Sequence, residues 1–339
     1  MTTPPSGSER AAREGRSPEL SAQLLAEEVE RCGYVVTWVH YAYFRTVVEG
    51  VVIGFWCART DAVSAVAAMT SGRKDLTVEL LRDAGFPVAD SRTYYVDEWD
   101  DAAAGAFEQG PSLVVKPAWG RRGRGVTVGV ATADELRTAW ETATSVDPVR
   151  VVIERQVEGR ELRLLVVGGR TLAVAEKRPP TLIGDGQQTV EELIDEANQR
   201  RAANRHLTAY PLELDTWRRS RLEAVGLSPT SVLEAGRRLV VDPKASLIDG
   251  GHSIDVTDAV HLSYLDLAAE VTAAFPGLGV AGIDIIVGDP TSPVAPDDAI
   301  IEVNSMPGLG PHHFPMEGRS RDVAGPIVDH TLRTVLAAR

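Results

Sequence analysis

The sequence predicts a soluble protein of mixed α/β (α+β) class, because short apolar runs that suit strands alternate with segments of helical periodicity. Hydrophobic residues make up 44% of the chain and charged residues 24%, which is ordinary for a globular protein. At 339 residues the chain can form two domains, or one large domain with subdomains. It contains no apolar run long enough to span a membrane and no signal-peptide core, so we expect a cytoplasmic protein.

The chain is acidic, with a net charge of −13 that is spread along its length. This charge argues against nucleic acid or an anionic membrane as the main partner. An anionic ligand would therefore need local basic residues or a metal ion. Two cysteines, Cys32 and Cys57, do not make a disulfide framework, and because they lie in apolar runs we expect buried free thiols.

The first part of the chain is predicted to be a disordered polar segment, residues 1–17, followed by a small α/β domain, residues 18–105. Ser17 is expected to cap a helix in which Leu24 lies on the apolar face. The other elements expected in this domain are strands at 35–39 and 51–56 and helices near 61–69 and at 77–84, the last ended by Gly85.

The remainder is predicted to form two α+β regions, a smaller one at 106–170 and a larger one at 171–339. In the smaller region we expect strands at 113–116, 126–130, 151–154 and 162–167 and a helix at 133–143. In the larger region we expect strands at 171–177, 283–287 and 300–304 and helices at 189–202, 229–236, 264–274 and 321–337.

A lysine at the end of a strand runs into a glycine-rich loop at residues 118–125. Lys116 could add a positive charge to a phosphate, and glycines let backbone N–H groups surround phosphate oxygens. The loop matches neither the Walker pattern nor the dinucleotide fingerprint. A glycine turn with solvated arginines remains an alternative for this segment alone.

The segment 151–163 is a strand, a kinked connector and a second strand. A connector with free backbone groups can hydrogen-bond an adenine edge, and an acid that follows it can accept from ribose hydroxyls. Alternating Glu and Arg at 158–163 is also typical of a solvated face, so the segment alone does not decide between these readings.

Three oxygen-bearing side chains lie inside two apolar runs of the segment 282–308. Asp284 is in the first run, and Glu302 and Asn304 are two residues apart in the second, so they share one face of a strand. If the runs pair as a hairpin across the loop 288–298, all three side chains converge. Hard oxygen ligands suit Mg²⁺. The alternative for each acid is a solvated strand edge or a helix cap.

Taken in order, four stretches resemble the ATP-grasp superfamily of carboxylate–amine ligases: residues 72–88, 114–130, 151–169 and 282–308, supported by 183–194 and 250–261. Within that superfamily the chain is most similar to the ATP-grasp unit of cyanophycin synthetase and of bifunctional glutathione synthetase. The resemblance implies an ATP-grasp fold, with 18–105 as a pre-ATP-grasp domain. Residues 106–170 would be the lid, and 171–339 the large subdomain with the metal and substrate site.

The resemblance implies that two lysines and three glycines handle the ATP phosphates. Lys74 and Lys116 match the lysines that reach the phosphates, and Gly120, Gly123 and Gly125 match the loop that closes over them. 

Four residues are matched to the nucleoside part of ATP. Glu154 matches the acid on the adenine side, Gln156 and Val157 match the hinge whose backbone meets the base, and Glu161 matches the ribose acid.

The resemblance further makes Asp284, Glu302 and Asn304 the ligands of Mg²⁺, with two ions bridged by Glu302 and with Mn²⁺ as a substitute. Arg163 and Arg178 lie where the family places cations against the acyl phosphate or the acceptor substrate.

One departure concerns the reacting carboxyl. Related ligases carry an Asn beside it, whereas this chain has Ala245 at that position. Lys244 or Ser246 would have to supply the polar contact, or the substrate differs. Further along, His312 and His313 are either a loop packing pair or part of a substrate-pocket wall, and the clusters 204–206 and 216–219 are more typical of solvated helix surface than of a pocket.

The implied activity is an ATP-dependent ligase that forms an amide, of peptide or γ-glutamyl type, through an acyl phosphate. Small amino-acid substrates are the expected partners, and related ligases are homodimers or homotetramers. Two alternatives remain: a ligase for a peptide or secondary-metabolite acid, and an inactive ATP-binding regulatory module. The chain ends soon after the ATP-grasp unit, which puts the polymer building of cyanophycin synthetase in doubt for it.

Overall fold

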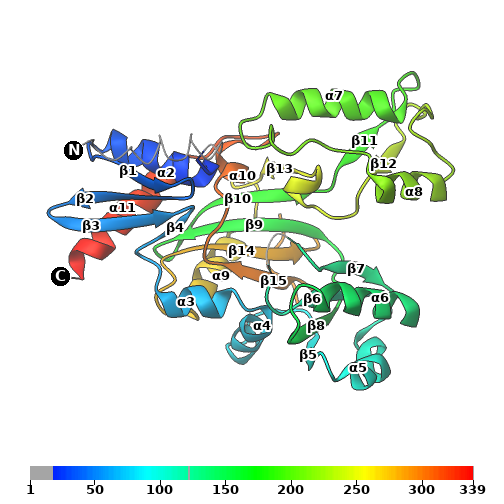
Figure 1. The fold of residues 1–339 in the computed structure, drawn as a ribbon, viewed down its shortest axis with the longest axis horizontal. Helices are drawn as coiled ribbons and strands as arrows, with labels where there is room; N and C mark the ends of the chain where they lie inside the picture. The colour runs from blue at the N-terminus through cyan, green and yellow to red at the C-terminus, as the bar shows by residue number, and fades with distance from the viewer. Residues whose placement is uncertain (1–17, 121–122, 339) are drawn as a thin grey trace, which may run out of the picture. The chain divides into compact units, whose positions relative to one another are not determined.

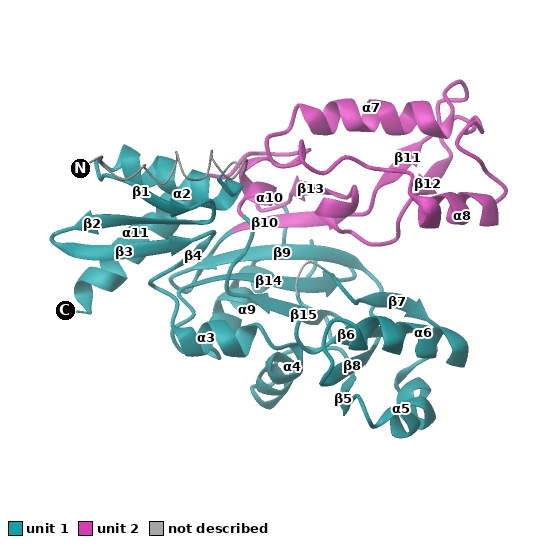
Figure 2. Cartoon of the chain, in the orientation of Figure 1, with its two compact units in different colours: residues 1–172, 258–308, 323–339 teal, residues 173–257, 309–322 magenta. Residues whose placement is uncertain are grey.

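The computed structural model describes residues 18–120 and 123–338, which divide into two compact units. Unit 1 comprises 1–172, 258–308 and 323–339, and unit 2 comprises 173–257 and 309–322 (Figure 2). The predicted disordered segment 1–17 lies outside the described residues.

Unit 1 begins with an antiparallel sheet whose strands lie in chain order (Figure 1). Phe44 and Phe55 are opposite each other in this sheet, and their rings stack with centroids 4.7 Å apart. Two helices pack on it, and the first is capped by Glu19, whose carboxylate accepts from the N–H of Ala22 at 3.0 Å. The elements are α2 (Leu20–Arg31), β1 (Thr37–His40), β2 (Tyr43–Val48), β3 (Val51–Trp56), β4 (Arg59–Thr60) and α11 (Ala324–Ala337).

A second antiparallel sheet of unit 1 has the order β5-β8-β6-β7. Its apolar face packs on α6, where Leu136 and Trp140 join Leu113 and Ile153 in one core. A capping box between Thr132 and Glu135 begins this helix. The elements are β5 (Ser91–Tyr95), α5 (Trp99–Gly105), η1 (Ala106–Gln109), β6 (Leu113–Pro117), β7 (Thr127–Val130), α6 (Ala133–Thr144) and β8 (Arg150–Arg155).

Three further strands of unit 1 form the antiparallel order β9-β14-β15. Strand β14 is buried along nearly its whole length, as its apolar sequence requires, and α9 packs against it. The elements are α3 (Ala65–Ser71), α4 (Lys74–Asp83), β9 (Arg160–Val167), α9 (Leu262–Ala273), β14 (Val280–Val287) and β15 (Ala299–Asn304).

Unit 2 contains two antiparallel strand pairs, β10 with β13 and β11 with β12. Its core gathers apolar side chains of α7, α8 and the β11–β12 pair, including Leu193, Leu222 and Leu239. The elements are β10 (Arg170–Arg178), β11 (Thr181–Ile183), α7 (Val190–Ala202), α8 (Thr216–Ala224), β12 (Arg238–Val240), η2 (Leu247–Asp249), β13 (His252–Asp255) and α10 (Gly310–His313).

The helix predicted at 229–236 is wrong, because this segment is irregular and the helix of the region is α8. Its backbone is used by its neighbours: the carbonyls of Pro229 and Ser231 accept from the first N–H groups of α7 at 2.9 Å each. The carbonyl of Leu233 accepts from the N–H of Gly186. The backbone of the segment therefore bonds the start of α7 and the loop before it instead of forming its own helix.

The expectation of buried thiols is also wrong, since Cys32 is exposed and Cys57 is partly exposed; neither is in a disulfide. Each residue lies at an element end, Cys32 as the C-cap of α2 and Cys57 in the turn after β3, where apolar flanks do not ensure burial. Within the described residues, none of the helices combines the length and the apolar character that crossing a bilayer requires.

Candidate active site

A row of charged side chains crosses three neighbouring strands of unit 1. Asp284 of β14 lies opposite Arg163 of β9 on one side and opposite Glu302 of β15 on the other. Directly opposed residues in antiparallel strands place their side chains on one face. Asn304 follows two residues after Glu302 and is paired with Gly282. The strand register therefore brings Asp284, Glu302 and Asn304 to the same face.

Asp284 is held by a bidentate ion pair. Both carboxylate oxygens accept from Arg163, one from Nε and one from Nη2, and both side chains are buried. Burial by itself would lower the pKa of Arg163, but the charges of Asp284, Glu302 and Glu161 and the hydrogen bonds to Asp284 raise it. Arg163 is thus a permanently charged group beside the acidic pair.

The donor atoms of this row suit a hard divalent cation. The row contains two carboxylates and one amide oxygen; both oxygens of Asp284 accept from Arg163, and the amide oxygen of Asn304 accepts from the N–H of Met306 at 2.9 Å. Across the residues that the structure describes, no three His, Cys, Asp or Glu side chains are grouped to hold a metal. An ion held by this row would need water or phosphate oxygens to complete its shell.

The two lysines matched to ATP phosphates lie in unit 1 together with the acidic row. Lys116 of β6 forms a buried ion pair with Glu154 of β8 at 2.7 Å. Lys74 begins α4, and its Nζ donates to the carbonyl of Gly120 at 3.0 Å. Burial lowers the pKa of Lys74. The negative charge of Glu302 raises this pKa, and the positive charge of Lys116 lowers it. The charges of Lys116 on β6 and Glu302 on β15 therefore act on Lys74 of α4.

The glycine loop leaves β6 beside Lys74. The N–H of Lys74 donates to the carbonyl of Ala118 at 2.9 Å, and the N–H of Trp119 donates to Asp147 at 2.9 Å. Gly123 and Gly125 have φ angles of 68° and 74°, a conformation that favours glycine. A Cβ at Gly125 would also lie 2.9 Å from Val146. Residues 121–122 of this predicted lid loop lie outside the described residues.

The connector between β8 and β9 presents backbone groups at Val157. The N–H of Gln156 donates to Ser112 at 2.9 Å, and its side-chain oxygen accepts from Gly129 at 2.8 Å. The backbone of Val157 makes no hydrogen bond with any described residue. Glu161 follows in β9 on the same face as Arg163. The connector therefore presents backbone groups at Val157, and an acid follows it in β9.

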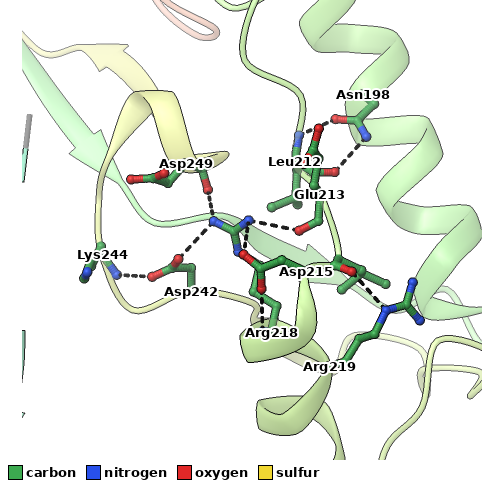
Figure 3. Close-up of polar contacts among 10 residues, drawn as sticks. Asn198, Leu212, Glu213, Asp215, Arg218, Arg219, Asp242, Lys244 and Asp249 are labelled. Atoms are coloured by element: carbon green, nitrogen blue, oxygen red, sulfur yellow. Dashed lines mark hydrogen bonds and ion pairs between the residues drawn. The ribbon is translucent and has the colours of Figure 1, made fainter. Parts of the chain in front are cut away.

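The two other residues matched to catalysis, Arg178 and Lys244, belong to unit 2. Arg178 ends β10 and pairs with Glu176 at 3.0 Å. The backbone N–H of Lys244 donates to Asp242 at 3.0 Å (Figure 3), while its Nζ makes no hydrogen bond or ion pair with the described residues. Ala245 and Ser246 follow in the same loop, and both are half-buried.

Unit 2 also buries two arginines, one of them in a cluster that was expected to be solvated surface. Arg218 is buried, whereas its neighbours Trp217 and Arg219 are exposed, so the expectation of a solvated surface at 216–219 is wrong for Arg218. Arg201 is buried at the end of α7. Helical spacing could have revealed both, since Arg218 precedes the core residue Leu222 by four and Arg201 follows Ile194 by seven.

A surface cavity of about 410 Å³ in unit 2 is lined by Asn204 and Arg205 of the cluster at 204–206 and by the segment around His313. Arg205 lies over the ring of Phe314 at 5.6 Å from its centroid, and Asn204 donates to the carbonyl of Phe314 at 2.9 Å. His313 is half-buried in the wall, whereas His312 is buried and does not line the cavity. The residues that line this cavity include a guanidinium and an imidazole but no carboxylate.

Comparisons with known proteins give consistent relatives, although no protein-family model matches the chain. Cyanophycin synthetase from Crocosphaera subtropica is 36% identical over 260 residues, which covers 76% of this chain and 30% of that protein. The glutathione biosynthesis bifunctional protein of Mannheimia succiniciproducens is 32% identical over 270 residues, covering 77% of this chain and 35% of that protein. The chain spans about a third of the length of these relatives.

The crystal structure of a bifunctional glutathione synthetase from Pasteurella multocida matches the fold, with a TM-score of 0.67 and 25% sequence identity. The match covers 93% of this chain and 44% of that one, so it includes both units.

Proposed function

We propose that this chain, a homologue of the ATP-grasp carboxylate–amine ligases and a protein of their fold, is itself an ATP-dependent ligase that joins an amino-acid carboxylate to an amine. The observation that carries the proposal is the row Arg163–Asp284–Glu302 on adjacent strands, in electrostatic contact with Lys74. A cation, two carboxylates and a second cation in one place suit the binding and transfer of a phosphoryl group.

In this proposal unit 1 binds ATP. Lys74 and Lys116 hold the phosphates, with Gly120, Gly123 and Gly125 over them. Glu154 and the backbone at Gln156 and Val157 take the base, and Glu161 takes the ribose. The free backbone of Val157 and the position of Lys74 against Gly120 support these assignments.

Asp284, Glu302 and Asn304 would hold the metal, for which we propose two magnesium ions, with manganese as a substitute. The bound ions would neutralise phosphate charge. The hard oxygen donors of Asp284, Glu302 and Asn304 support the choice of metal. Arg163 is already paired with Asp284 and would add a fixed positive charge to the same region.

The reaction has two steps. A substrate carboxylate attacks the γ-phosphorus of ATP, which forms an acyl phosphate and releases ADP. An amine then attacks the acyl carbon, loses a proton, and displaces phosphate to leave an amide. We assign Arg163, Arg178 and Lys244 to the acyl phosphate and the acceptor substrate. Such a mixed anhydride hydrolyses in water, so the loop 118–125 would close over it.

Glutamate or aspartate is the proposed carboxyl donor, and a γ-glutamyl dipeptide is the proposed product class. A peptide or secondary-metabolite acid is the second candidate, because Ala245 stands where related ligases carry an Asn. We propose a homodimer or homotetramer as the working assembly. The polymer synthesis of cyanophycin synthetase is not part of the proposal, since the chain spans only 30% of that relative.

The test is incubation of the protein with ATP, Mg²⁺ and pools of amino acids, followed by measurement of ADP and of new masses. ADP release that depends on two amino acids, with a product mass equal to their sum minus water, supports the ligase. ATP binding without stimulated turnover in any pool would instead support an inactive ATP-binding regulatory module.

We expect Glu302→Gln to reduce ADP formation by about 100-fold or more, because a metal-ligating carboxylate is lost. The matched control is Glu270→Gln, the same substitution at an exposed position of α9, which should leave turnover unchanged. Near-normal turnover by Glu302→Gln would contradict the metal assignment.

A further inference from the structure

The loop that carries Lys244 and Ala245 is held by hydrogen bonds from buried side chains. This segment, residues 242–251, runs from the end of β12 to the start of β13 in unit 2 and includes the short helix η2. It contains little regular structure, so its conformation depends on what its backbone groups contact.

Arg201 of α7 makes most of these contacts. Its guanidinium donates to the carbonyls of Gly250 at 2.8 Å, Gly251 at 2.7 Å and Leu247 at 3.1 Å, and to Tyr210 at 2.8 Å. The side chain is 4% exposed and has no carboxylate partner among the described residues. Three of its four acceptors are therefore carbonyls of the 242–251 loop.

Arg218 of α8 holds the same loop through other atoms (Figure 3). Its Nη2 donates to the carbonyl of Asp249 at 2.8 Å and to the carboxylate of Asp242 at 3.1 Å, and its Nη1 donates to the carbonyl of Glu213 at 2.9 Å. Asp242 in turn accepts from the backbone N–H of Lys244 at 3.0 Å. Arg218 thus fixes the position of Lys244 through one intervening carboxylate.

The buried charge of Arg201 is unfavourable for stability. Burial lowers its pKa to about 10, because carbonyls replace water around a cation that has no opposing charge nearby. An apolar side chain at such a site is often at least as stable as a buried ion. A planar group that can bond several carbonyls at once is instead suited to fixing a loop geometry.

The held loop packs closely on one of the residues assigned to catalysis. A Cβ at Gly251 would lie 2.8 Å from the carbonyl oxygens of both Arg178 and Ser246. The loop backbone therefore lies against the end of β10, and the side chain of Lys244 is left without a bond to the described residues. Lys244 remains available to a ligand.

We propose that Arg201 and Arg218 are positioning residues that set the 242–251 loop so that Lys244 meets the carboxylate of the substrate. The inference rests on the proposed function and deepens it: the loop takes an anionic, carboxylate-bearing substrate. Related ligases carry an Asn at the position of Ala245. In this chain Lys244, on a loop that two buried guanidiniums hold, supplies the polar contact that the Asn side chain supplies there.

The experiment uses the full chain with Arg201→Gln, with Arg201→Lys as a second variant that keeps the charge, and with Arg200→Gln as the matched control. Arg200 precedes Arg201 in α7 and is exposed. Amide hydrogen exchange is measured by mass spectrometry across the chain, and KM is measured separately for ATP and for L-glutamate and L-aspartate.

We expect Arg201→Gln to increase exchange in peptides covering 242–251 by about tenfold or more, the scale on which charged hydrogen bonds contribute. KM for the amino acid should rise by a similar factor while KM for ATP changes less than about twofold, since the proposed ATP residues lie in unit 1. Arg201→Lys should show the same pattern, because the compact ammonium cannot reach the separate carbonyls that the forked guanidinium bonds at once. Arg200→Gln should resemble the native chain.

Unchanged exchange at 242–251 in both Arg201 variants would overturn the proposal. So would a parallel loss of all kinetic parameters with the folded fraction, which is the behaviour of a purely structural residue. If the native chain turns over no amino acid, the proposed function fails. The contact with substrate then fails with it, and the exchange data still decide whether Arg201 holds the loop.

Discussion

Buried charges in this protein are compensated in different ways. Lys116 is paired with Glu154 and Arg163 with Asp284, both within unit 1. Arg201 in unit 2 is compensated by carbonyls alone. These two pairs lie where ATP and metal are proposed, and a bound phosphate or cation could exchange partners with them. The buried pair of Arg218 with Asp242 in unit 2 instead holds the 242–251 loop. The unpaired one supports a loop.

Arg201 also affects its neighbour His206. Burial, and then the positive charge of Arg201, lower the pKa of His206 to about 4. Between the ordinary value of 6.5 and about 4, the unfolded chain binds a proton at His206 that the folded chain does not. Stability contributed by neutral His206 is therefore lost as pH falls through this window.

We expect the free energy of unfolding to decrease between about pH 7 and about pH 5 in both the native chain and His206→Gln. The decrease should be smaller in His206→Gln, by on the order of 1–2 kcal/mol. Urea denaturation at the two pH values measures this. Packing lost in the variant affects both pH values alike, so the comparison isolates the proton. An identical fall in both proteins would show that His206 titrates normally when folded.

At the scale of elements, the strands β9, β14 and β15 determine the site. The hairpin of β14 and β15 was expected from the two apolar runs, and it places Asp284 opposite Glu302. The third strand was predicted as a strand, but nothing in its sequence indicates that Arg163 lies opposite Asp284. That pairing depends on which strand β14 neighbours and in what register.

The Arg163–Asp284 pair allows a double-mutant test. We expect Arg163→Met and Asp284→Leu each to cost about 3–5 kcal/mol of unfolding free energy, because each leaves a buried charge alone. The double variant should recover most of that loss while remaining inactive.

The matched control for this cycle is the exposed pair Arg333 and Asp329 of α11, where loss of either partner should cost less than about 1 kcal/mol. Urea unfolding of each set gives the values. Additive costs for Arg163 and Asp284 would mean that the buried pair is not coupled as its geometry requires.

At the scale of the whole molecule, the two units carry different parts of the proposed reaction. Every residue matched to ATP or metal lies in unit 1, while Arg178, Lys244 and the loop that holds Lys244 lie in unit 2. This division makes nucleotide binding and substrate turnover separable by mutation.

We expect Lys74→Met to weaken binding of a non-hydrolysable ATP analogue with Mg²⁺ by about tenfold or more, because a charged phosphate contact is lost. Lys244→Met should bind the analogue within about twofold of the native chain and still lose amino-acid-dependent turnover. Calorimetry measures the first quantity and ADP release the second. Equal weakening of analogue binding by both variants would contradict the division.

The sequence by itself determined the α/β class and the resemblance to ATP-grasp ligases, and both are confirmed by the relatives and by the matching fold. Local patterns suffice for these because strand and helix periodicity, and motifs such as the run from Lys116 to Gly125, depend on near neighbours in the chain. The helix predicted at 229–236 was wrong because its carbonyls accept from the N–H groups of α7, and local sequence patterns do not show such a contact.

Tertiary structure alone decided which charges meet. The ion pair of Arg163 with Asp284 joins residues 121 positions apart, and the contacts of Arg201 with Gly250 and Gly251 join residues about 50 apart. Helical spacing can indicate that an arginine is buried, but it does not indicate which groups surround the guanidinium. Only the folded chain shows whether a carboxylate, a row of carbonyls or water surrounds it, and that surrounding sets its energy and its role.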